Sequence, residues 1–596
     1  MAWRWYEMTD KNEVITIPDK GLEEAIKYEL NLNPNCEITK DNIKSLRWLD
    51  ASNKGILDLT GLDNAINLEE LYLGYNQIED ISTLSELTNL KILNLSNNQI
   101  QDIKVLSDLI NLKKLYLNNN KIDDISLLSN ITNLQCIDLS NNKIESIDIL
   151  KDLRKLNYLN LSNNKIKDIK SLNSLVDIFN LNLSNNIIEE IKQLDNLTDL
   201  NELNLSNNRI EEIKGLDKLN RLHGLNLSNN RISEIKGLDR LKGLHDLNLS
   251  FNEIREIKGL DKLDELRKLN LSDNKIVAIE GLNSLRKLEF LDLSYNRIIK
   301  IEGLNMLEKL CNLNLFSNEI KEIKGLEWLD ELHKLNLSDN KIVDIQGLDN
   351  LKRLKNLNLS SNEIIKIKGL KNLKRLNTLD LSFNLIREIK GLDQLVELED
   401  LNLCKNKIGN IINLKYNLKL KNLNLSKNEN ILIEGIKELT HLEALDLGYT
   451  NRKELGEEIQ LLTNLKELYL RSNEKISIEG IKNLTNLEVL DLGYTNRKEL
   501  GEIKNLDNLK ELYLYNNNLI SMEGIENLKK LEILDLSNNE IEKVENIKGL
   551  NNLKSIDKLK GLDLSYNKII STEGIEELYN LENLYLRNNH IEEIGN

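Results

Sequence analysis

The chain is poor in the residues that divide a protein or anchor it in a membrane. Only two of its 596 residues are proline, Pro18 and Pro34, so no proline-rich linker separates domains. No apolar run approaches the ~18 residues of a membrane helix. The first residues, MAWRWYEMTDKNEV, lack the basic-then-apolar order of a secretory signal. We therefore expect no membrane span.

Cysteine and net positive charge are also lacking. The four cysteines lie far apart without a CxxC motif, which argues against a zinc site or a disulfide framework: Cys36, Cys136, Cys311 and Cys404. The net charge of −16 argues against nucleic acid as a partner, because phosphate binding needs a basic face. The sequon N-L-S recurs from Asn94 onward, and glycans there would cover the most regular surface of the molecule. These features favour a reduced, cytoplasmic protein.

The chain is rich in leucine, isoleucine and asparagine arranged in a 22-residue repeat. The asparagine of LxxLxLxxNxIxxI recurs every 22 residues from Asn76 through Asn428, and then less evenly to Asn589. With a degenerate first copy and two copies that carry threonine instead, Thr450 and Thr495, we identify about 25 repeats. A single core rarely grows beyond ~250–300 residues. Self-similarity at this period therefore predicts a solenoid.

Each fixed position of the repeat has a physical role. In LxL, two leucines point to one face of a short strand and the residue between them points to the other. Stacked copies predict a parallel sheet, with Leu203 and Leu205 buried against the next coil. The asparagine amide is expected to satisfy backbone groups of adjacent coils, which are costly to bury unpaired. Gly215 permits a tight turn before a short helical return on the outer face.

The sequence predicts two parts, an N-terminal helical cap over residues 1–45 and a solenoid over residues 46–596 that is irregular from about residue 430. Apolar residues at helical spacing in IPDKGLEEAIKYEL predict one cap helix, and TKDNIKSL predicts a second. A six-residue insertion falls within KGLNNLKSIDKL. The final segment, LYLRNNHIEEIGN, has no obvious cap, which leaves an edge for end-to-end self-association.

The unit LxxLxLxxNxIxxIxxLxxLxx resembles the phosphatase-regulator type of leucine-rich repeat, also found in bacterial internalins. The segment that begins IPDKGLEEAIKYEL resembles the N-terminal cap of bacterial members. The likeness covers nearly the whole chain. It implies an α/β solenoid, curved into a horseshoe or superhelix, with a parallel β-sheet on the concave face and short 3-10 or α segments on the convex face. It also implies protein binding, without naming a partner.

No constellation of residues in the sequence points to catalysis, a cofactor or a metal ion, so we expect no enzyme. His223, His245 and His333 share one repeat position, but no third ligand at fixed spacing completes a metal site. One row of lysines follows a row of glutamates by two residues, which we interpret as a solvated charge lattice rather than an anion-binding stripe. The lysines are Lys170, Lys192, Lys214, Lys236 and Lys258.

The concave face is the expected binding surface. Its central lane is nearly uniform from Asn160 to Asn270 and offers hydrogen bonds with little discrimination. Toward the C-terminus, tyrosine and arginine, which are enriched at interface hot spots, replace it. The candidate binding residues are Tyr449, Tyr469, Arg471, Tyr494, Tyr513, Tyr515, Tyr566, Tyr585 and Arg587. A smaller aromatic group is a second candidate: Phe251, Phe290, Tyr295 and Phe316. Alternatively, tyrosine merely fills tolerant exposed positions.

We therefore expect a non-enzymatic scaffold that binds a protein partner through its concave face, centred near residues 446–587. Two alternatives stay open at this point. One is a structural solenoid that assembles end to end through its uncapped C-terminus. The other is a bacterial surface or secreted adhesin-like virulence protein, although the internalins' export signal and wall-attachment region have no counterpart in the sequence.

Overall fold

The computed structural model describes residues 13–545, 547, 561–575, 578 and 581–594 of the chain. The described chain divides into unit 1, Met1–Asn296, and unit 2, Arg297–Asn596. The insertion predicted within KGLNNLKSIDKL falls outside the described residues. The predicted boundary between residues 45 and 46 stays a prediction.

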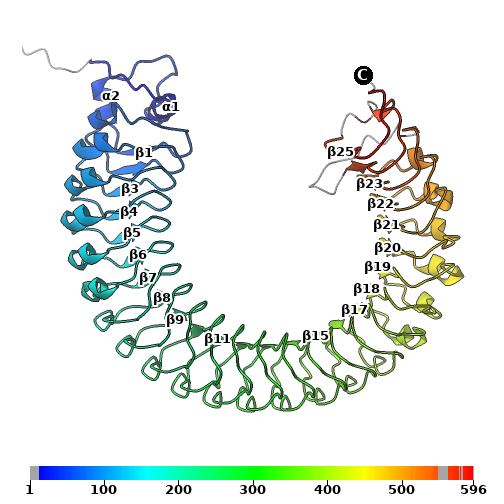
Figure 1. Cartoon of the computed structure of the whole chain (residues 1–596). Coiled ribbons are helices and arrows are strands. Elements are labelled where there is room, and N and C mark those ends of the chain that lie inside the picture. The colour runs from blue at the N-terminus through cyan, green and yellow to red at the C-terminus, as the bar shows by residue number, and fades with distance from the viewer. Residues whose placement is uncertain (1–12, 546, 548–560, 576–577, 579–580, 595–596) are drawn as a thin grey trace, which may run out of the picture. The chain divides into compact units, whose positions relative to one another are not determined.

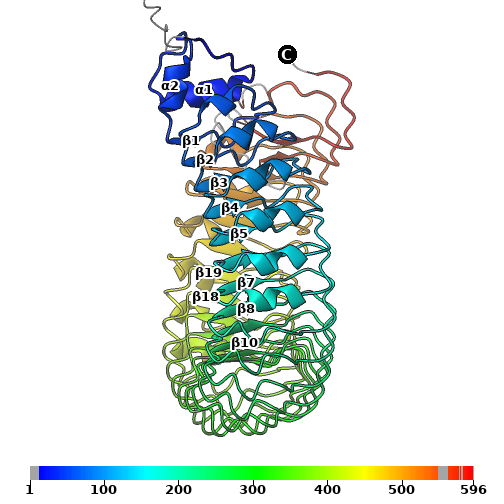
Figure 2. The same cartoon turned by 90° about the vertical axis from the view of Figure 1, so that its left-hand side faces the viewer.

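Unit 1 holds two N-terminal helices and then a run of three-residue strands (Figures 1 and 2). Neighbouring strands pair in parallel and in register, so that Leu203 lies opposite Leu225. The helices are α1 (Lys20–Glu29) and α2 (Lys40–Lys44). The strands are β1 (Trp48–Asp50), β2 (Glu70–Tyr72), β3 (Ile92–Asn94), β4 (Lys114–Tyr116), β5 (Cys136–Asp138), β6 (Tyr158–Asn160), β7 (Asn180–Asn182), β8 (Glu202–Asn204), β9 (Gly224–Asn226), β10 (Asp246–Asn248), β11 (Lys268–Asn270) and β12 (Phe290–Asp292).

Unit 2 continues the same pattern of parallel, in-register strands. In each unit by itself, the strands lie along one side and the turns or 3-10 segments along the opposite side (Figure 1). The strands of unit 2 are β13 (Asn312–Asn314), β14 (Lys334–Asn336), β15 (Asn356–Asn358), β16 (Thr378–Asp380), β17 (Asp400–Asn402), β18 (Asn422–Asn424), β19 (Ala444–Asp446), β20 (Glu467–Tyr469), β21 (Val489–Asp491), β22 (Glu511–Tyr513), β23 (Ile533–Asp535), β24 (Leu562–Asp563) and β25 (Leu584–Tyr585).

Both predicted N-terminal helices are present, and each begins at a side chain that caps it. The Asp19 carboxylate accepts a hydrogen bond from the Leu22 N–H at 3.1 Å at the start of α1. Thr39 and Asn42 form a capping box at the start of α2. Asp19 also accepts a bond from the Leu57 N–H at 2.8 Å, which ties the start of α1 to the first coil.

The core of each unit is a stack of leucines and isoleucines at fixed repeat positions. Leu203 and Leu205 are buried, and so are Ile210 and Ile213, as the repeat predicted. Asn204, between the two leucines, points to the other side of the sheet and stays half-buried. The alternation of the LxL segment therefore separates a buried face from an accessible one in every coil.

The repeated asparagine, here called the ladder asparagine, joins each coil to the one before it. The Asn230 Oδ1 accepts a hydrogen bond from the Ile210 N–H at 3.0 Å. Its Nδ2 donates to the Leu205 carbonyl of the previous coil at 3.0 Å, and to Leu227 and Ser228 of its own coil at 3.1 and 3.2 Å. One amide thus satisfies four backbone groups, which confirms the role predicted from the sequence.

The outer side differs from the prediction in the middle of the chain. Where no glycine intervenes, bonds such as Leu84 N–H to Ile81 O at 3.0 Å start a 3-10 turn. At Gly215 the backbone is left-handed, with φ of 71°, and the return has separate turns, the first closed by Leu219 N–H to Leu216 O at 3.1 Å. The helical return predicted after Gly215 is therefore wrong for this coil, because its turns stay separate. A left-handed glycine does not by itself prevent a 3-10 segment, since Ile436–Glu438 follows the left-handed Gly435.

The 3-10 segments occur in two groups within the described residues. They are η1 (Leu62–Asn64), η2 (Ser82–Glu86), η3 (Lys104–Asp108), η4 (Ser126–Asn130), η5 (Asp148–Asp152) and η6 (Lys170–Ser174) in unit 1, and η7 (Ile412–Tyr416), η8 (Ile436–Glu438), η9 (Glu457–Leu461), η10 (Ile481–Asn483), η11 (Gly501–Asn505) and η12 (Ile525–Asn527) in unit 2.

The repeats that carry threonine replace the ladder amide with two side chains. The Thr450 hydroxyl lies 2.7 Å from the Leu447 carbonyl and 3.0 Å from the Oδ1 of Asn473. The Arg452 guanidinium, two residues on, donates to the Ile431 carbonyl of the previous coil at 2.7 Å. The hydroxyl and the guanidinium together bind backbone groups within a coil and across to its neighbour, as one asparagine does elsewhere.

Replacement of a ladder asparagine should destabilise the protein far more than replacement of the half-buried centre-lane asparagine in the same coil. We expect Asn230→Ala to lower the free energy of unfolding by about 2–4 kcal/mol, because buried backbone groups left unpaired cost ~1–3 kcal/mol each. Asn226→Ala is the matched control, since its Oδ1 accepts only from the Ser228 N–H at 3.0 Å. Urea unfolding followed by circular dichroism measures both changes, and equal midpoints for the two variants would contradict the proposed role.

Candidate functional site

Four positions of each coil that face away from the core line up along the sheet side of the stack. In the β20 coil they are Glu467 in the opening lane, Tyr469 in the centre lane, Arg471 in the seat lane and Ser472 in the turn lane. The first two belong to the strand, and the others lie two and three residues beyond the strand's last residue. Because strands stack ~4.8 Å apart, each lane is a row of side chains at that spacing.

In most coils the centre lane serves the backbone of its own turn. The Asn204 Oδ1 accepts a hydrogen bond from the Ser206 N–H at 3.0 Å, and Asn226 and Asn248 repeat this bond to Ser228 and Ser250. These oxygens are therefore already used. The lane offers a partner mainly amide N–H groups that are alike from coil to coil, which gives little basis for discrimination.

The tyrosines and arginines predicted from the sequence fall in three different lanes between β19 and β25. The centre lane holds Tyr469, Tyr513 and Tyr585; the seat lane holds Arg471, Tyr515 and Arg587; the turn lane holds Tyr449, Tyr494 and Tyr566. Only the centre-lane residues lie on strands, and the turn-lane residues have left-handed backbones. The set is thus a broad surface and not a single cluster.

The centre-lane tyrosines are held in place by a carboxylate of their own strand. The Tyr469 hydroxyl donates to Glu467 at 3.0 Å, and the Tyr513 hydroxyl donates to Glu511 at 2.9 Å. Burial, and after it the adjacent glutamate, raises the pKa of both tyrosines above the ordinary value. Both rings therefore remain neutral and oriented at neutral pH, as rigid contact surfaces for an approaching chain.

Two glycines of the duplicated DLGYT motif make room for the large seat-lane residues of the next coil. A Cβ on Gly448 would lie 2.9 Å from the Arg471 Cγ, and a Cβ on Gly493 would lie 2.3 Å from the Tyr515 ring. We call these positions glycine seats. Each lets a long side chain fold back across the preceding coil, where a serine usually stands.

Arg471 bridges two carboxylates of the centre lane. Its guanidinium lies 3.5 Å from both Asp446 and Asp491. Asp491 is nearly fully buried, and this burial raises the pKa of its carboxyl group, an effect that Arg471 partly offsets. Tyr515 stands on the far side of Asp491, and burial and that carboxylate raise the pKa of Tyr515 to about 12.

The turn-lane tyrosines are exposed, and ring contacts link them to neighbouring coils. Lys427 lies over the Tyr449 ring at 5.2 Å, and Arg587 lies over the Tyr566 ring at 5.8 Å. Tyr494 meets Tyr515 edge to face, with ring centroids 5.6 Å apart. The structure therefore groups Tyr494 with Tyr515 above β21 and β22, and Tyr566 with Arg587 above β24 and β25.

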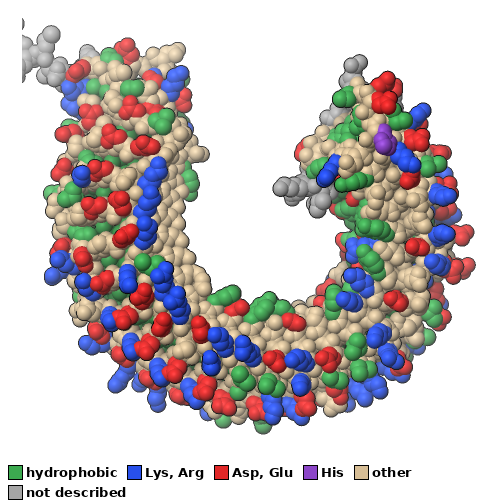
Figure 3. All heavy atoms as spheres, viewed as in Figure 1, with side chains coloured by type: hydrophobic (Ala, Val, Ile, Leu, Met, Phe, Trp, Pro, Cys, Tyr) green, Lys and Arg blue, Asp and Glu red, His purple; other side chains and the backbone are tan. Residues whose placement is uncertain are grey.

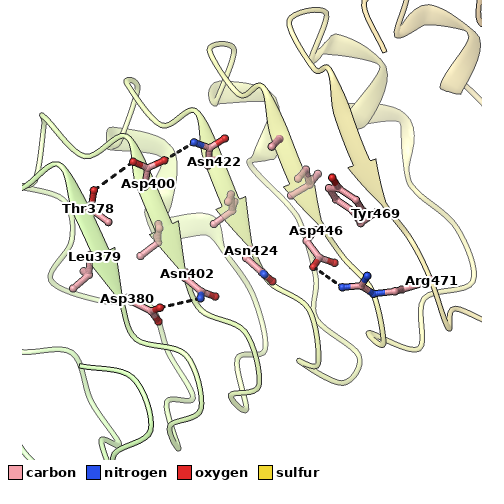
Figure 4. Close-up of a pocket in the computed structure, with 14 residues that line it drawn as sticks. Thr378, Leu379, Asp380, Asp400, Asn402, Asn422, Asn424, Asp446, Tyr469 and Arg471 are labelled. Atoms are coloured by element: carbon pink, nitrogen blue, oxygen red, sulfur yellow. Dashed lines mark hydrogen bonds and ion pairs between the residues drawn. The ribbon is translucent and has the colours of Figure 1, made fainter. Parts of the chain in front are cut away.

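The sheet side of unit 2 is hollowed over β16 to β20, and we call this pocket the trough (Figure 4). Its volume is about 320 Å³. Asp380 stands at one end, and Tyr469 and Arg471 close the other. Ala444 in the opening lane of β19 leaves the space beside the Tyr469 ring empty of side chain.

Most residues that line the trough were not among those predicted. Asp380 accepts from the Ser382 N–H at 2.8 Å and from Asn402 Nδ2 at 3.1 Å. Asp400 accepts from the Thr378 hydroxyl at 3.4 Å and also bonds Asn422. Aspartate in place of the usual asparagine in LDLS was the available sequence signal for Asp380.

The other candidates from the sequence are dispersed. The rings of His223 and His245 lie 4.8 Å apart, and no group of three metal-ligating residues occurs among the described residues. Phe290 lines a second, larger hollow of about 600 Å³ over β7 to β12. Phe251 and Tyr295 are exposed turn-lane residues of unit 1. Phe316 is a half-buried residue of unit 2. The second hollow lies mainly along the uniform asparagine lane.

Each lysine of the row forms an ion pair with a nearby carboxylate, as expected for a surface of alternating charges. Lys170 lies 2.9 Å from Asp168, and the remaining four each pair with the glutamate two residues earlier. These side chains are mostly exposed, so the pairs contribute little energy. Basic and acidic side chains are interspersed over this surface (Figure 3).

Sequence reasoning also missed an aromatic group on the sheet side of unit 1. Trp48 opens β1, and its ring centroid lies 6.2 Å from that of Tyr72 in the centre lane of β2. Tyr116 follows in the centre lane of β4, and Tyr158 opens β6. Tyr72 and Tyr116 occupy the same lane as Tyr469 and Tyr513, so position within the repeat was the available signal for these two, while Trp48 and Tyr158 lie in the opening lane. No helix among the described residues is long and apolar enough to cross a membrane.

Comparison with known proteins identifies the repeat. A family model described as two copies of the leucine-rich repeat matches residues 88–130, 132–174, 220–262, 264–306, 330–372, 352–394, 507–552 and 557–596. A second model, a leucine-rich repeat region, matches residues 382–523. The comparison with curated proteins gave no match.

Solved structures with TM-scores above 0.5 share the fold. A leucine-rich repeat protein of Leptospira interrogans is 26% identical, with a TM-score of 0.52, over 68% of this chain and 97% of its own. The plant peptide hormone receptor RGFR1 in complex with RGF2 is 20% identical, with a TM-score of 0.55, over 89% of each chain. An internalin, InlF of Listeria monocytogenes, is 26% identical, with a TM-score of 0.37, over 70% of this chain and 98% of its own.

The buried carboxyl group of Asp535, in the centre lane of β23, predicts a pH-dependent change in stability. Burial raises its pKa above 3.8, so the folded state disfavours the ionised form. Asp535→Asn keeps the oxygen that accepts from the Ser537 N–H at 2.9 Å, and should raise the unfolding midpoint at pH 7. The gain should shrink as the pH falls through the raised pKa toward 3.8, since both forms are then neutral.

Thermal unfolding of wild type and variant between pH 3.5 and 8 measures this difference. Asp124→Asn is a control of opposite sign, because the bond from the Ser126 N–H at 2.8 Å lowers the pKa of Asp124. That substitution should destabilise at pH 7, with the loss fading as the pH falls through the lowered pKa. A midpoint that falls in Asp535→Asn at neutral pH would contradict the analysis.

Proposed function

Because the chain belongs to the leucine-rich repeat family, we propose that it is a non-enzymatic scaffold that binds a protein partner through the sheet side of unit 2, at the trough. The trough is the observation that carries this proposal. It is a hollow in the surface that is lined by Tyr469 and Arg471, and tyrosine and arginine are enriched at interface hot spots. The other predicted tyrosines and Arg587 extend the same surface toward β25.

The character of the surface supports a protein or peptide partner over nucleic acid. The trough has three aspartates and one arginine, and phosphates would be repelled from it. Tyr469 and Tyr513 present neutral rings held by hydrogen bonds, so little conformational entropy is lost when they are covered. The plant receptor with the same fold is in complex with RGF2, which supports a peptide as a ligand of this fold.

We propose that the protein is cytoplasmic, because cysteine is scarce and because glycans on the repeated N-L-S sequons would cover the most regular surface of the molecule. The described cysteines are all free, which accords with it. End-to-end self-association and an adhesin-like role stay predictions. Light scattering over a concentration series tests the former, since a mass that does not change with concentration would exclude it.

The decisive test compares Tyr469 with a tyrosine of identical local structure. Tyr72 closes the strand Glu70–Tyr72, and its hydroxyl donates to Glu70 at 3.0 Å, as Tyr469 does to Glu467. We expect Tyr469→Ala to weaken binding of partners captured from native cell lysate by about 30-fold, since a hot-spot tyrosine contributes ~2 kcal/mol.

Tyr72→Ala, in unit 1, should retain full capture and is the matched control. Quantitative mass spectrometry of proteins bound to wild type and to each variant provides the measurement. Circular dichroism establishes that both variants fold. Equal capture by wild type and Tyr469→Ala would place the binding surface elsewhere.

A further inference from the structure

The two ends of the trough differ in charge balance. At the Tyr469 end, Asp446 is neutralised by Arg471 at 3.5 Å, and Arg471 is shared with buried Asp491. At the other end, Asp380 and Asp400 are bonded only to uncharged donors, and no ion pair joins either one to a cation within the described part of the chain. Negative charge therefore remains at the β16–β17 end.

The middle of the trough offers a hydrogen-bond donor suited to a peptide carbonyl. The Asn424 Oδ1 accepts from the Ser426 N–H at 3.0 Å and from the Ser426 hydroxyl at 2.6 Å. Its Nδ2 has no hydrogen-bond partner among the described residues and lines the trough (Figure 4). Ala444, which lies opposite Asn422 on the next strand, presents only a methyl group, so a backbone can approach closely there.

We infer, resting on the proposed function, that the trough takes an extended peptide segment of the partner with a lysine or arginine at Asp380 and Asp400 and an apolar side chain at Tyr469. The segment runs along the stack, across the strands. Its cation supplies the positive charge that the β16–β17 end lacks. Its apolar side chain packs on the Tyr469 ring, which the Glu467 bond keeps in place.

The geometry of the stack sets the spacing of these two residues in the partner. Asp400 opens β17 and Tyr469 closes β20, so the two lie in adjacent lanes and are three strands apart, which is roughly 14 Å along the stack at ~4.8 Å per strand. An extended chain covers roughly 14 Å in four residues at ~3.4 Å each, and residues four apart face the same side. The expected pattern is therefore a basic residue and an apolar residue separated by three others.

Metal and anion binding fit the trough less well. No group of three potential metal-ligating residues was found among the described residues, and the oxygens of Asp380 and Asp400 already accept bonds from side chains of neighbouring coils. An anion would meet the aspartates with only Arg471 to offset them. A peptide with a basic side chain at Asp380 and Asp400 and an apolar side chain at Tyr469 would contact both ends of the trough.

The experiment is a selection of random dodecapeptides displayed on phage against the full chain, run in parallel on three proteins. These are wild type, the double variant Asp380→Asn with Asp400→Asn, and the control Asp138→Asn. Asp138 matches Asp380 in detail, because it accepts from the Ser140 N–H at 2.9 Å and from Asn160 Nδ2 at 3.2 Å, but it lies in unit 1. Each substitution retains the acceptor oxygen, and circular dichroism checks folding.

Peptides from wild type and from Asp138→Asn should carry lysine or arginine four residues from an aromatic or aliphatic residue, and the basic preference should disappear with the double variant. For a recovered peptide, replacement of its basic residue by glutamine should weaken binding at least tenfold on wild type and less than threefold on the double variant. Affinity measured by fluorescence anisotropy should also fall as salt rises, because the contact is between charges.

The possible failures of the inference and of the proposed function are distinguishable. Peptides that require Tyr469 but show no basic residue, or show it at another spacing, would overturn the inference and leave the binding function intact. Peptides whose binding is unaffected by Tyr469→Ala would contradict the proposed function itself. A loss of the basic preference in Asp138→Asn as well would overturn the assignment of the charge to the trough.

Discussion

The ladder asparagine is the constraint on which the rest of the molecule depends. A coil of this size cannot pair its own backbone, and in the ladder coils one amide satisfies backbone groups in two coils at once, as Asn230 does with Leu205 of the previous coil and Leu227 of its own. The same residue fixes register, because its reach requires the next coil to lie directly above. The leucine positions then tolerate little substitution, because each leucine packs against both the preceding and the following coil. Sequence variation without loss of the fold is confined to the lanes that face solvent.

A sheet of this kind can distinguish partners only where its lanes depart from uniformity, and unit 2 departs from uniformity in two ways. In the trough the departure is a loss of bulk, because Ala444 in the opening lane of β19 presents only a methyl group, while Tyr469 stands in the centre lane of the next strand and closes the hollow. At the glycine seats the departure is a pairing across coils, in which Gly448 admits Arg471. Neither change touches the core, and in the coils with glycine seats the ladder position is held by Thr450 and Thr495. A rigid sheet can carry such features without having to be rebuilt around them.

Features that depend on one coil and its neighbour could be predicted from the repeat, whereas features that span several coils could not. The role of the ladder asparagine, the burial of Leu203 and the lanes of Tyr469 and Arg471 follow from the period of the repeat, because each depends on contacts within a coil and to its neighbour. The helical return after Gly215 failed because the turns there stay separate, whereas after the left-handed Gly435 they form a 3-10 segment, and the period does not encode this local difference. The trough was beyond prediction for a different reason. It is a relation among side chains of five successive coils, including Asp380 and Tyr469, and no single copy of the repeat contains it.

The duplicated DLGYTNRKELGE unit shows how a copied segment can acquire different chemistry without a new fold. Both copies bring a glycine seat, a centre-lane aspartate and a turn-lane tyrosine, yet the residue that fills the seat comes from the following coil and differs between them. Arg471 fills the first and pairs with two aspartates, while Tyr515 fills the second and meets Tyr494 edge to face. The first seat is therefore charged and lies beside the trough, and the second is aromatic and lies beyond it. Because the filling residue belongs to a separate coil, one substitution there changes the chemistry of the surface while the copied unit and its ladder stay as they are.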